Sequence, residues 1–459
     1  MLDFWEITSV FITDLYSMIG FFLMPFLWIF IPLILLIVAK DLWLKYSRQR
    51  SIQKMEWILL EVRPPRDIQK TPYAMEQFFT GLHGIWSLPT FWEKNFQGYT
   101  QRWYSLEIVG QSGDVRFLIR THALYRDLVE ANVYAQYPES EISQVDDYVS
   151  SVPADIPNEE YNVWGSEFVL LKEDAYPIRT YVDFEKDAKT EEQRIDPLAS
   201  LLEIMNKLKD GEQFWIQTLI RPVGSSWKEE GEKIRDKLVG RVEVKKESMI
   251  KKEISAWGQT GLGVANQLLT GQSSEMSAAE EKKKQETPFL WSTTKGEQDV
   301  VSAIERNISK LGFETIIRFV YVARRDVYRI VHVLAVIGSY RQFNTLNLNG
   351  FKPNTAVTTS VDYQIKFKKS REEYRRKRII EDYRKRHFVQ QSAIIKYLKP
   401  LFFERLPILR WFFIRSKPFV FNIEELATIY HYPAITVKSP LVPKVDSKKS
   451  EPPAGLPTG

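Results

Sequence analysis

The sequence predicts an α+β protein made of one transmembrane helix, two successive β-α-β-β-α-β units and a basic helical region. Three observations predict this organisation: an uncharged apolar run near the N-terminus, two rounds of strand-like and helix-like patterns, and a block of basic residues toward the C-terminus. Hydrophobic residues make up 44% and charged residues 26% of the 459 residues, which is ordinary for a chain with packed cores. Cysteine is absent, which excludes a disulfide framework and a thiol nucleophile.

The predicted transmembrane helix spans residues 18–40, after a short extracytoplasmic segment at residues 1–17. Residues 18–39 carry no charge, and about 22 residues at ~1.5 Å each are long enough to cross a hydrocarbon layer of ~30 Å. A buried core helix is the alternative, whereas a signal peptide would need a basic region before the run and a small-residue cleavage site after it. The side chains assigned to the membrane anchor are Ile19, Phe22, Leu27, Trp28, Ile34, Leu36 and Val38.

Basic residues flank this run on one side only, where residues 41–54 form a basic juxtamembrane segment. The residues expected to set the topology are Lys40, Lys45, Arg48 and Arg50. Because lysine and arginine are retained on the cytoplasmic side, the N-terminus is expected outside and the rest of the chain in the cytoplasm. The chain is therefore predicted to be a single-pass protein of the inner membrane.

Residues 55–150 are predicted to form the first α+β unit. Strand patterns cover residues 56–62, 102–109, 114–120 and 141–148, and helix patterns cover residues 71–82 and 123–136. The first helix follows Thr71 and Pro72, a capping oxygen before a proline at the first helical position. The second strand alternates, with Tyr104, Leu106 and Ile108 on one face. The resulting order, β-α-β-β-α-β, is that of a ferredoxin-like unit.

Residues 160–355 repeat this alternation less regularly and are predicted to form a second ferredoxin-like unit. Strand patterns cover residues 168–171, 178–182, 214–220 and 313–323, and helix patterns cover residues 196–208, 227–238, 297–311 and 327–339. Residues 244–287 interrupt the unit and are rich in lysine, glutamate, serine, glutamine and glycine. This composition predicts a flexible insertion.

Residues 356–435 are predicted to be a basic and amphipathic helical region, and residues 436–459 a disordered tail. Between residues 365 and 387 the sequence has eleven lysines and arginines against four acidic residues. Such a block is usually the solvated face of a helix, and the alternatives are contact with anionic lipid head groups or with nucleic acid phosphates. The candidate contact residues are Arg371, Arg375, Arg376, Lys377, Arg378, Arg384, Lys385 and Arg386.

The sequence predicts no catalytic residue, no cofactor and no metal site. The glycine-rich residues 258–263 lack the lysine and the hydroxyl side chain that a phosphate-binding loop needs. The five histidines are scattered, and none has a second histidine at the spacing of a helical metal site. We therefore expect a protein that is not an enzyme.

Two segments resemble known families. Residues 56–72, together with residues 135–138, resemble a bacterial family of membrane-anchored domains of unknown function that lie ahead of conjugation-type ATPases and occur in small-genome candidate-phyla bacteria. Residues 421–433, with the sequence FNIEELATIYHYP, resemble the segment N-x-E-E-L-A-T-L-[FWY]-H-[FL]-P of type IV secretion and HerA/TraG-like ATPases. In those ATPases this segment lies just before the motor domain, and residues 451–457 are similar to the proline-rich link that leads into it.

The resemblance implies a non-enzymatic, membrane-anchored scaffold subunit of a type IV secretion or conjugation-like system that docks a separate HerA/TraG-like ATPase. The Walker motifs of the motor are not in the sequence, so ATP hydrolysis is assigned to no residue. The residues that the resemblance implies for docking are Glu424, Glu425, Leu426, His431 and Pro433.

Two alternatives accompany this hypothesis. From the residues alone, the same C-terminal segment is a capped helix with Asn422 as N-cap, Glu425 at the third helical position and Leu426 buried. The alternative function is a membrane tether that binds DNA through the basic helix. The hexameric motors also suggest, by analogy alone, that the chain forms a homo-oligomer.

Overall fold

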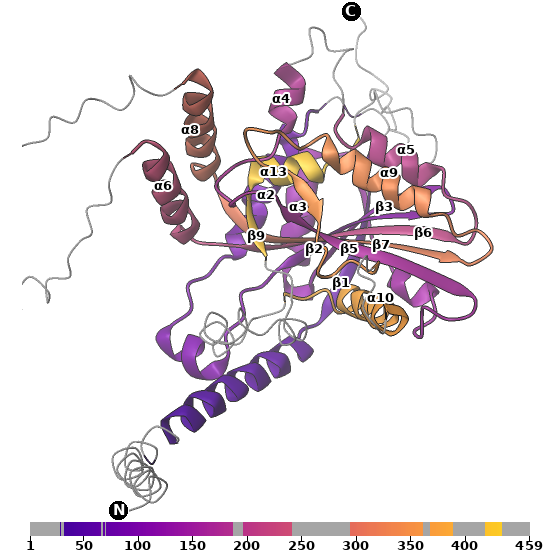
Figure 1. Ribbon diagram of the computed structural model, residues 1–459, viewed down its shortest axis with the longest axis horizontal. Coiled ribbons are helices and arrows are strands. Elements are labelled where there is room, and N and C mark those ends of the chain that lie inside the picture. Colours follow the sequence, from indigo (N-terminus) through magenta and orange to yellow (C-terminus); the bar gives the residue numbers. More distant parts are fainter. Residues whose placement is uncertain are drawn as a thin grey trace, which may run out of the picture.

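A single antiparallel sheet runs through the part of the chain that the structure describes (Figure 1). The computed structural model describes residues 28, 32–65, 68, 70–186, 196–240, 294–360, 368–388 and 418–433. Within these residues the sheet has nine strands in the order β4-β1-β3-β2-β6-β7-β5-β8, and β9 pairs with β7 off this path. Each of these strand pairs is antiparallel.

Strands β1 to β4 form the first half of the sheet. Its elements are β1 (Trp57–Arg63), α2 (Tyr73–Leu82), β2 (Tyr104–Gln111), β3 (Asp114–His122), α3 (Arg126–Gln136) and β4 (Glu141–Gln144). Strand β3 lies between β1 and β2 and is antiparallel to both, so β1 and β2 are parallel to each other and α2 connects them across β3. Strand β1 lies between β3 and β4 and is antiparallel to both. Strands β3 and β4 are therefore parallel to each other, and α3 connects them across β1. This is the split βαβ arrangement of a ferredoxin-like unit.

Strands β5 to β8 form the second half with the same topology. Its elements are β5 (Tyr161–Leu170), α4 (Tyr181–Lys186), α5 (Ala199–Asn206), β6 (Glu212–Pro222), α6 (Ser226–Leu238), α8 (Lys295–Ile308), β7 (Gly312–Arg324), α9 (Ile330–Arg341) and β8 (Phe351–Pro353). The order β6-β7-β5-β8 corresponds to β2-β3-β1-β4 in the first half. Where the first half has the tight turn at Ser112 and Gly113, the second half has α6 and α8 between its two central strands.

The two halves are joined edge to edge by β2 and β6. Their pairing runs from Tyr104↔Ile220 to Gln111↔Gln213. The two ferredoxin-like units are therefore parts of one continuous sheet, which places residues of both halves side by side on each of its faces.

One face of the sheet is buried under α2, α3, α5, α9 and α13 (Ile423–Ile429), as Figure 1 shows. Phe78 of α2, Leu202 of α5 and Val336 of α9 belong to the same core as Phe214 and Ile216 of β6. The neighbouring Trp215 points to the opposite face, because successive side chains of a strand alternate.

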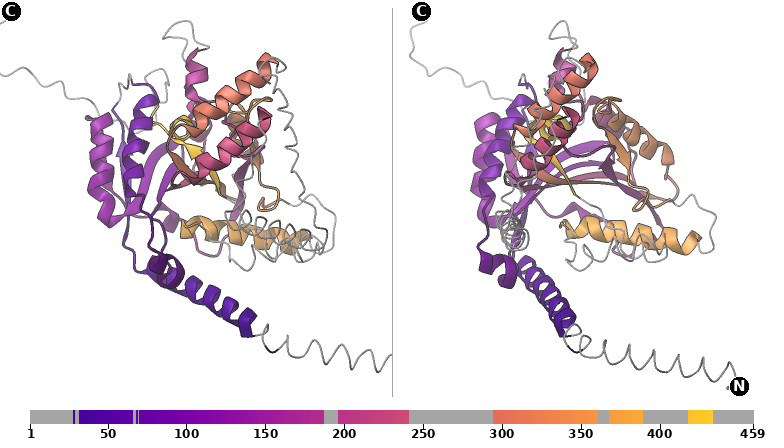
Figure 2. Two further views of the ribbon diagram at one scale, coloured as in Figure 1. Left: turned by 90° about the vertical axis from the view of Figure 1, so that its left-hand side faces the viewer. Right: turned by 60° about the vertical axis from the view of Figure 1, so that its left-hand side comes forward.

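The opposite face is covered by α10 (Lys368–Lys385) and by the short 3-10 helix Tyr148–Ser151. Figure 2 shows α10 on this side of the sheet, apart from the other helices of the body. Ile379, Ile380 and Tyr383 of α10 pack in one core with Trp215 and Val320 of the sheet. The helix is basic, yet it carries an apolar stripe that buries this face.

The predicted transmembrane helix is wrong. Among the residues that the structure describes, no helix is both long enough and apolar enough to cross a bilayer. The N-terminal helix, residues 32–53, is uncharged only up to Ala39, because Lys40 and Asp41 follow within the same helix. Trp28, Ile34 and Leu36 are exposed, and Val38 is half-buried. Residues 1–17 and the assigned anchor residues Ile19, Phe22 and Leu27 lie outside the described residues.

Two strand predictions in the second half are also wrong in detail. Residues 178–182 are not a strand, because helix α4 begins at Tyr181 and the Thr180 N–H donates to the Asp183 carboxylate at 3.4 Å, as at a helix start. Strand β5 begins at Tyr161 rather than at residue 168. Strand β8 was not predicted, because three residues are too few for a periodic pattern. The insertion at 244–287 and the tail at 436–459 lie outside the described residues.

Candidate functional site

The C-terminal segment that resembles the ATPases lies inside the molecule (Figure 1). Strand β9 (Phe419–Asn422), helix α13 and the residues that follow to Pro433 are together called the β9–α13 segment, residues 419–433. Every residue from 421 to 433 is buried. Strand β9 extends the sheet by pairing with residues 312–315 of β7.

Asn422 fixes the start of α13 and connects it to α8. Its side chain accepts the Glu425 N–H at 2.8 Å, and the Glu425 carboxylate accepts the Asn422 N–H at 3.0 Å. This reciprocal capping box confirms the capped helix that the residues predicted. The Asn422 side-chain amide also donates to Asn307 Oδ1 at 2.7 Å, which ties the cap to the end of α8.

Glu424 is the centre of a buried ionic cluster that joins three helices. Its carboxylate accepts hydrogen bonds from Arg306 Nη2 at 2.8 Å, from Lys310 Nζ at 2.6 Å and from the Thr180 hydroxyl. Lys310 also pairs with Glu76 of α2 at 2.9 Å. Burial alone would raise the pKa of Glu424, but the hydrogen bonds from Lys310 and Thr180 and the nearby charges outweigh it, so this pKa lies below its ordinary value. The cluster holds α2, α8 and α13 together.

Glu425 is also completely buried, but it faces backbone groups instead of cations. Its two carboxylate oxygens accept the N–H groups of Asn422 and Ile178, each at 3.0 Å. Burial raises the pKa of Glu425 to about 8, although both hydrogen bonds favour the ionised form. The adjacent charge of Glu424 raises it further. Glu425 is therefore mainly protonated at neutral pH.

The end of the β9–α13 segment contacts both halves of the sheet. His431 Nδ1 lies 2.9 Å from the Ala427 carbonyl, and His431 Nε2 lies 3.0 Å from the Asp196 carboxylate, just before α5. Both partners accept hydrogen bonds, so the two bonds form together only when both ring nitrogens carry a proton. Tyr432 packs edge-on against Phe117 of β3 and Tyr137 in the first half.

The residues predicted to dock an ATPase are therefore not at the surface of the described structure. Glu424, Glu425, Leu426, His431 and Pro433 are all buried against other parts of the same chain. Their contacts explain why this string of residues is needed for the fold itself. A direct contact between these side chains and a separate protein would require the segment to leave its place.

A row of polar side chains crosses the sheet beneath α10, and the sequence interpretation missed it. Strand pairing places Glu107 beside Gln217, Gln217 beside Arg318, and Arg318 beside Glu167. Arg318 Nε donates to Glu167 at 2.6 Å and its Nη1 to Gln217 at 3.3 Å. Burial raises the pKa of Glu167, and the charge of Arg318 opposes this effect. The signal in the sequence was a charged or amide residue with at least one apolar neighbour inside each of these strands.

Arg386 closes this row at the first half of the sheet. Its guanidinium donates to Glu107 at 2.7 Å and 3.1 Å and to Asp147 at 2.6 Å and 2.8 Å. Glu107 also accepts the Tyr148 hydroxyl at 2.8 Å, and Tyr148 shares a 2.7 Å hydrogen bond with Tyr383. Arg386 has a positive φ of 47°, so the chain turns sharply where its side chain enters the body.

The other basic residues predicted to contact phosphate or lipid also form contacts within the chain. Arg384 donates to the carbonyls of Val152, Pro153 and Ala154, and Arg375 donates to the carbonyls of Thr355 and Thr358. The remaining contacts are Arg376 with Asn162, Arg378 with Tyr374 and Asp382, Lys377 with Glu373, and Lys385 with Glu381. Arg371 lies on the same helix and also has an interaction. Arg375, Arg376 and Arg384 thus fasten α10 to the sheet and its loops, and the DNA-tether alternative stays a prediction.

The residues predicted to set the topology lie on the N-terminal helix. Lys40 Nζ donates to Asn95 Oδ1 at 3.4 Å and lies over the ring of Phe96. Lys45 and Arg50 are exposed, and Arg48 is half-buried. Among the described residues there is no group of three or more metal-ligating side chains.

Helix α9 presents an uncovered apolar face on the same side of the sheet as α13 (Figure 1). Val333 and Val336 are buried in the core, whereas Val331 and Leu334 are 65% and 62% exposed. Gly338 follows on the same face, and a side chain there would meet no atom within 4 Å. A helix that is apolar on all sides is expected to be covered. The outer face of α9 is therefore a candidate surface for a partner protein.

The described residues form one α+β module, in which two ferredoxin-like halves share a single antiparallel sheet. The chain belongs to the family described as "Domain of unknown function (DUF8128)", which matches residues 39–442. The match spans both halves of the sheet, α10 and the β9–α13 segment. No curated protein matches the sequence.

Proposed function

We propose that this chain is a non-enzymatic scaffold subunit of a type IV secretion or conjugation-like system and that it docks a separate HerA/TraG-like ATPase. The observation that carries the proposal is the resemblance of the β9–α13 segment to the segment before the motor in those ATPases, and here this segment is buried within the fold. The capping box and the Glu424 cluster fix this segment to α2 and α8. A partner bound beside it would keep a fixed orientation relative to the sheet.

The docking surface of this proposal is the outer face of α9. Gln342, at the end of α9, donates to the Pro197 carbonyl at 2.6 Å, next to the Asp196 carboxylate that pairs with His431. Helix α9 is thus connected through the start of α5 to the end of the β9–α13 segment. Exposed valine and leucine side chains on a rigid helix suit a protein partner, because apolar area that is removed from water stabilises an interface.

The test is to purify the tagged full-length chain from cells of its own species and to identify the co-purifying proteins by mass spectrometry. We expect a HerA/TraG-like ATPase with the wild-type chain and its loss with the double variant Val331→Glu and Leu334→Glu. The matched control is Tyr374→Glu, because Tyr374 is 57% exposed on α10, on the other face of the sheet. The control should recover the ATPase fully.

Two results would contradict the proposal. One is the absence of any such ATPase from the wild-type preparation when the cells express one. The other is equal recovery with the α9 double variant and the wild-type chain. The non-enzymatic part has its own readout, since the purified chain alone should hydrolyse no ATP above a blank that contains Mg²⁺.

A further inference from the structure

We propose that the N-terminal helix (residues 32–53) and the loop at residues 86–97, which ends in the π-helix Glu93–Gln97, form one surface that lies on an anionic lipid bilayer without crossing it. These two segments are together called the aromatic foot. They lie at the end of the molecule away from α4 and α8 (Figure 1). The inference goes beyond the scaffold function, because it concerns a different surface and a different partner.

The aromatic foot is a single body, although the residues that join its two segments are 50 and 53 positions apart in the sequence. The Trp43 indole N–H donates to the Phe96 carbonyl at 3.0 Å, and the Ser47 hydroxyl donates to the Gln97 carbonyl at 2.7 Å. The chain turns away at Gly98, whose φ is +66° and where a side chain would lie 2.9 Å from the Arg48 backbone nitrogen. The loop is therefore held against the helix.

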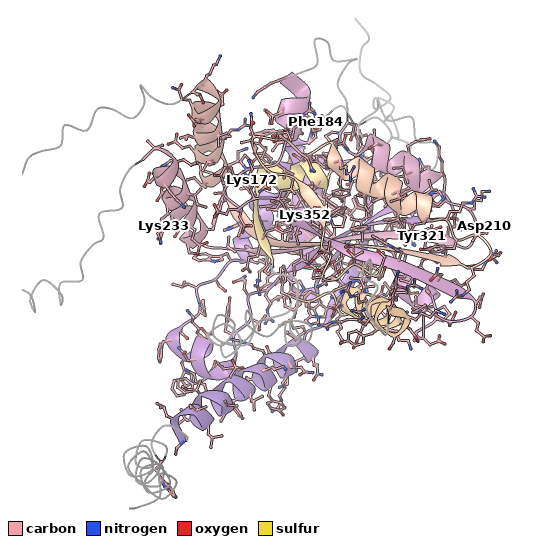
Figure 3. The ribbon with its side chains drawn as sticks, viewed as in Figure 1. Lys172, Phe184, Asp210, Lys233, Tyr321 and Lys352 are labelled. Carbon is pink, nitrogen blue, oxygen red and sulfur yellow. The ribbon has the colours of Figure 1, made fainter. Side chains whose placement is uncertain are left out.

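The large apolar side chains of the aromatic foot point into solvent. Leu88 and Phe91 of the loop are 79% and 76% exposed, and Trp92 is 58% exposed. Leu36, Leu42 and Trp43 of the helix are exposed to a similar extent. None of these six residues belongs to a core cluster of the body. Figure 3 shows the side chains of these segments standing apart from the sheet. A continuous apolar surface of this kind marks an interaction site.

The chemistry of the surface favours lipid over protein. Tryptophan, phenylalanine and leucine beside lysine and arginine are the composition of segments that lie in the membrane interface. The aromatic foot has five basic residues (Lys40, Lys45, Arg48, Arg50 and Lys94) and two acidic residues (Asp41 and Glu93), a balance that suits anionic head groups. Residues 32–39 of the helix are the last part of the uncharged run at residues 18–39.

The absence of cysteine allows a direct test in the full-length chain. Leu88→Cys places a single environment-sensitive fluorophore on the aromatic foot, and Leu346→Cys places one at a position that is 98% exposed on the body. With vesicles of phosphatidylcholine and phosphatidylserine, the label at 88 should shift to the blue, brighten several-fold and be quenched by head-group spin labels. The label at 346 should stay in water. A label at 88 that stays in water, or that responds equally to pure phosphatidylcholine vesicles, overturns the proposal.

A second variant separates the aromatic foot from any other lipid-binding part of the chain. Phe91→Glu with Trp92→Glu should weaken partitioning into the same vesicles by about tenfold, because it replaces two apolar insertions with charges that anionic lipid repels. The matched control is Leu346→Glu, which should bind as the wild-type chain does. Unchanged binding by the double variant would contradict the proposal. A label at position 88 that becomes buried without lipid as the protein concentration rises would also contradict it, because this result would indicate that a second copy of the chain covers the surface.

Discussion

Arg386 and Glu107 form a completely buried ion pair across 279 residues of sequence, with Nε and Oε1 2.7 Å apart. The pair joins the end of the basic helix to the middle of β2, and Asp147 supplies a second carboxylate to the same guanidinium. Burial alone would lower the pKa of Arg386, but the charge of Glu107 and the hydrogen bonds to Asp147 and Glu107 outweigh it and hold this pKa well above its ordinary value. The basic helix is thus attached through a charge that solvent does not reach.

The first prediction concerns this attachment. Arg386→Met should lower the free energy of unfolding by about 3–5 kcal/mol, because it leaves the Glu107 carboxylate buried without its cation. Lys385→Met is the control, since Lys385 is half exposed and pairs only with Glu381 on the same helix, and it should change stability by less than about 0.5 kcal/mol. Urea unfolding of both variants measures the difference. Equal stability of the two would show that the buried pair has no such role.

The second prediction concerns the pH dependence that Glu424 confers. Its pKa lies below the ordinary value of 4.5, so its ionised form stabilises the folded state above about pH 4.5, and that stability is lost as the pH falls through the folded pKa. Glu424→Gln should therefore be less stable than wild type by about 1.5–3 kcal/mol at neutral pH, with a smaller difference in acid. Unfolding curves between pH 3 and pH 7 test this, and a difference that grows toward low pH would contradict it.

The third prediction has the opposite sign and concerns Glu425. Its pKa is raised to about 8, so the folded state keeps a proton that the unfolded chain releases near pH 4.5. The stability that this proton confers is present below pH 4.5 and is lost as the pH rises through about 8. Glu425→Gln, which stays neutral, should gain about 3–5 kcal/mol relative to wild type between pH 5 and pH 9. A difference in stability that does not change over this range would show that Glu425 ionises normally.

The fourth prediction concerns the close approach of α5 to the sheet at Gly110 of β2. A side chain there would lie 2.9 Å from Met205 Cβ, which cannot move away without shifting the helix. Gly110→Ala should lower stability by about 1–3 kcal/mol. Gly338→Ala on α9 places the alanine methyl group in open space. It should raise stability by about 0.5–1 kcal/mol, because glycine inside a helix loses more conformational freedom on folding than alanine does. Thermal unfolding of the two alanine variants distinguishes a packing requirement from a general effect of replacing glycine.

Most of the sheet could be predicted from the sequence, because β2 and β3 alternate between apolar and polar residues and β1, β6 and β7 are runs of β-branched, aromatic and other apolar residues. The pairing of β2 with β6 could not, because edge-to-edge pairing of two units leaves no periodic signal in either strand. The transmembrane helix was predicted from an uncharged run alone, and such a run does not show that the helix continues through Lys40 and Asp41 to residue 53.

The candidate site shows the same limit. The cap at Asn422 was predictable, because a side-chain oxygen followed three residues later by a glutamate is a local signal. The positions of Glu424 and Arg386 were not, because their partners Lys310 and Glu107 are 114 and 279 residues away. The acceptors of Arg375, Arg384 and Arg386 were not predictable either, because these carbonyl and carboxylate groups belong to other elements of the chain.

The central claim is that the outer face of α9 carries a separate ATPase, and a site-specific photo-crosslinker tests it most directly. The crosslinker replaces Val331 in the full-length chain, and a second chain carries it at Tyr374 on α10 as the control, both expressed in cells of the protein's own species. The account predicts an adduct between position 331 and a HerA/TraG-like ATPase, and no such adduct from position 374. An adduct from position 374 alone, or none from position 331 while the ATPase is present, would contradict it.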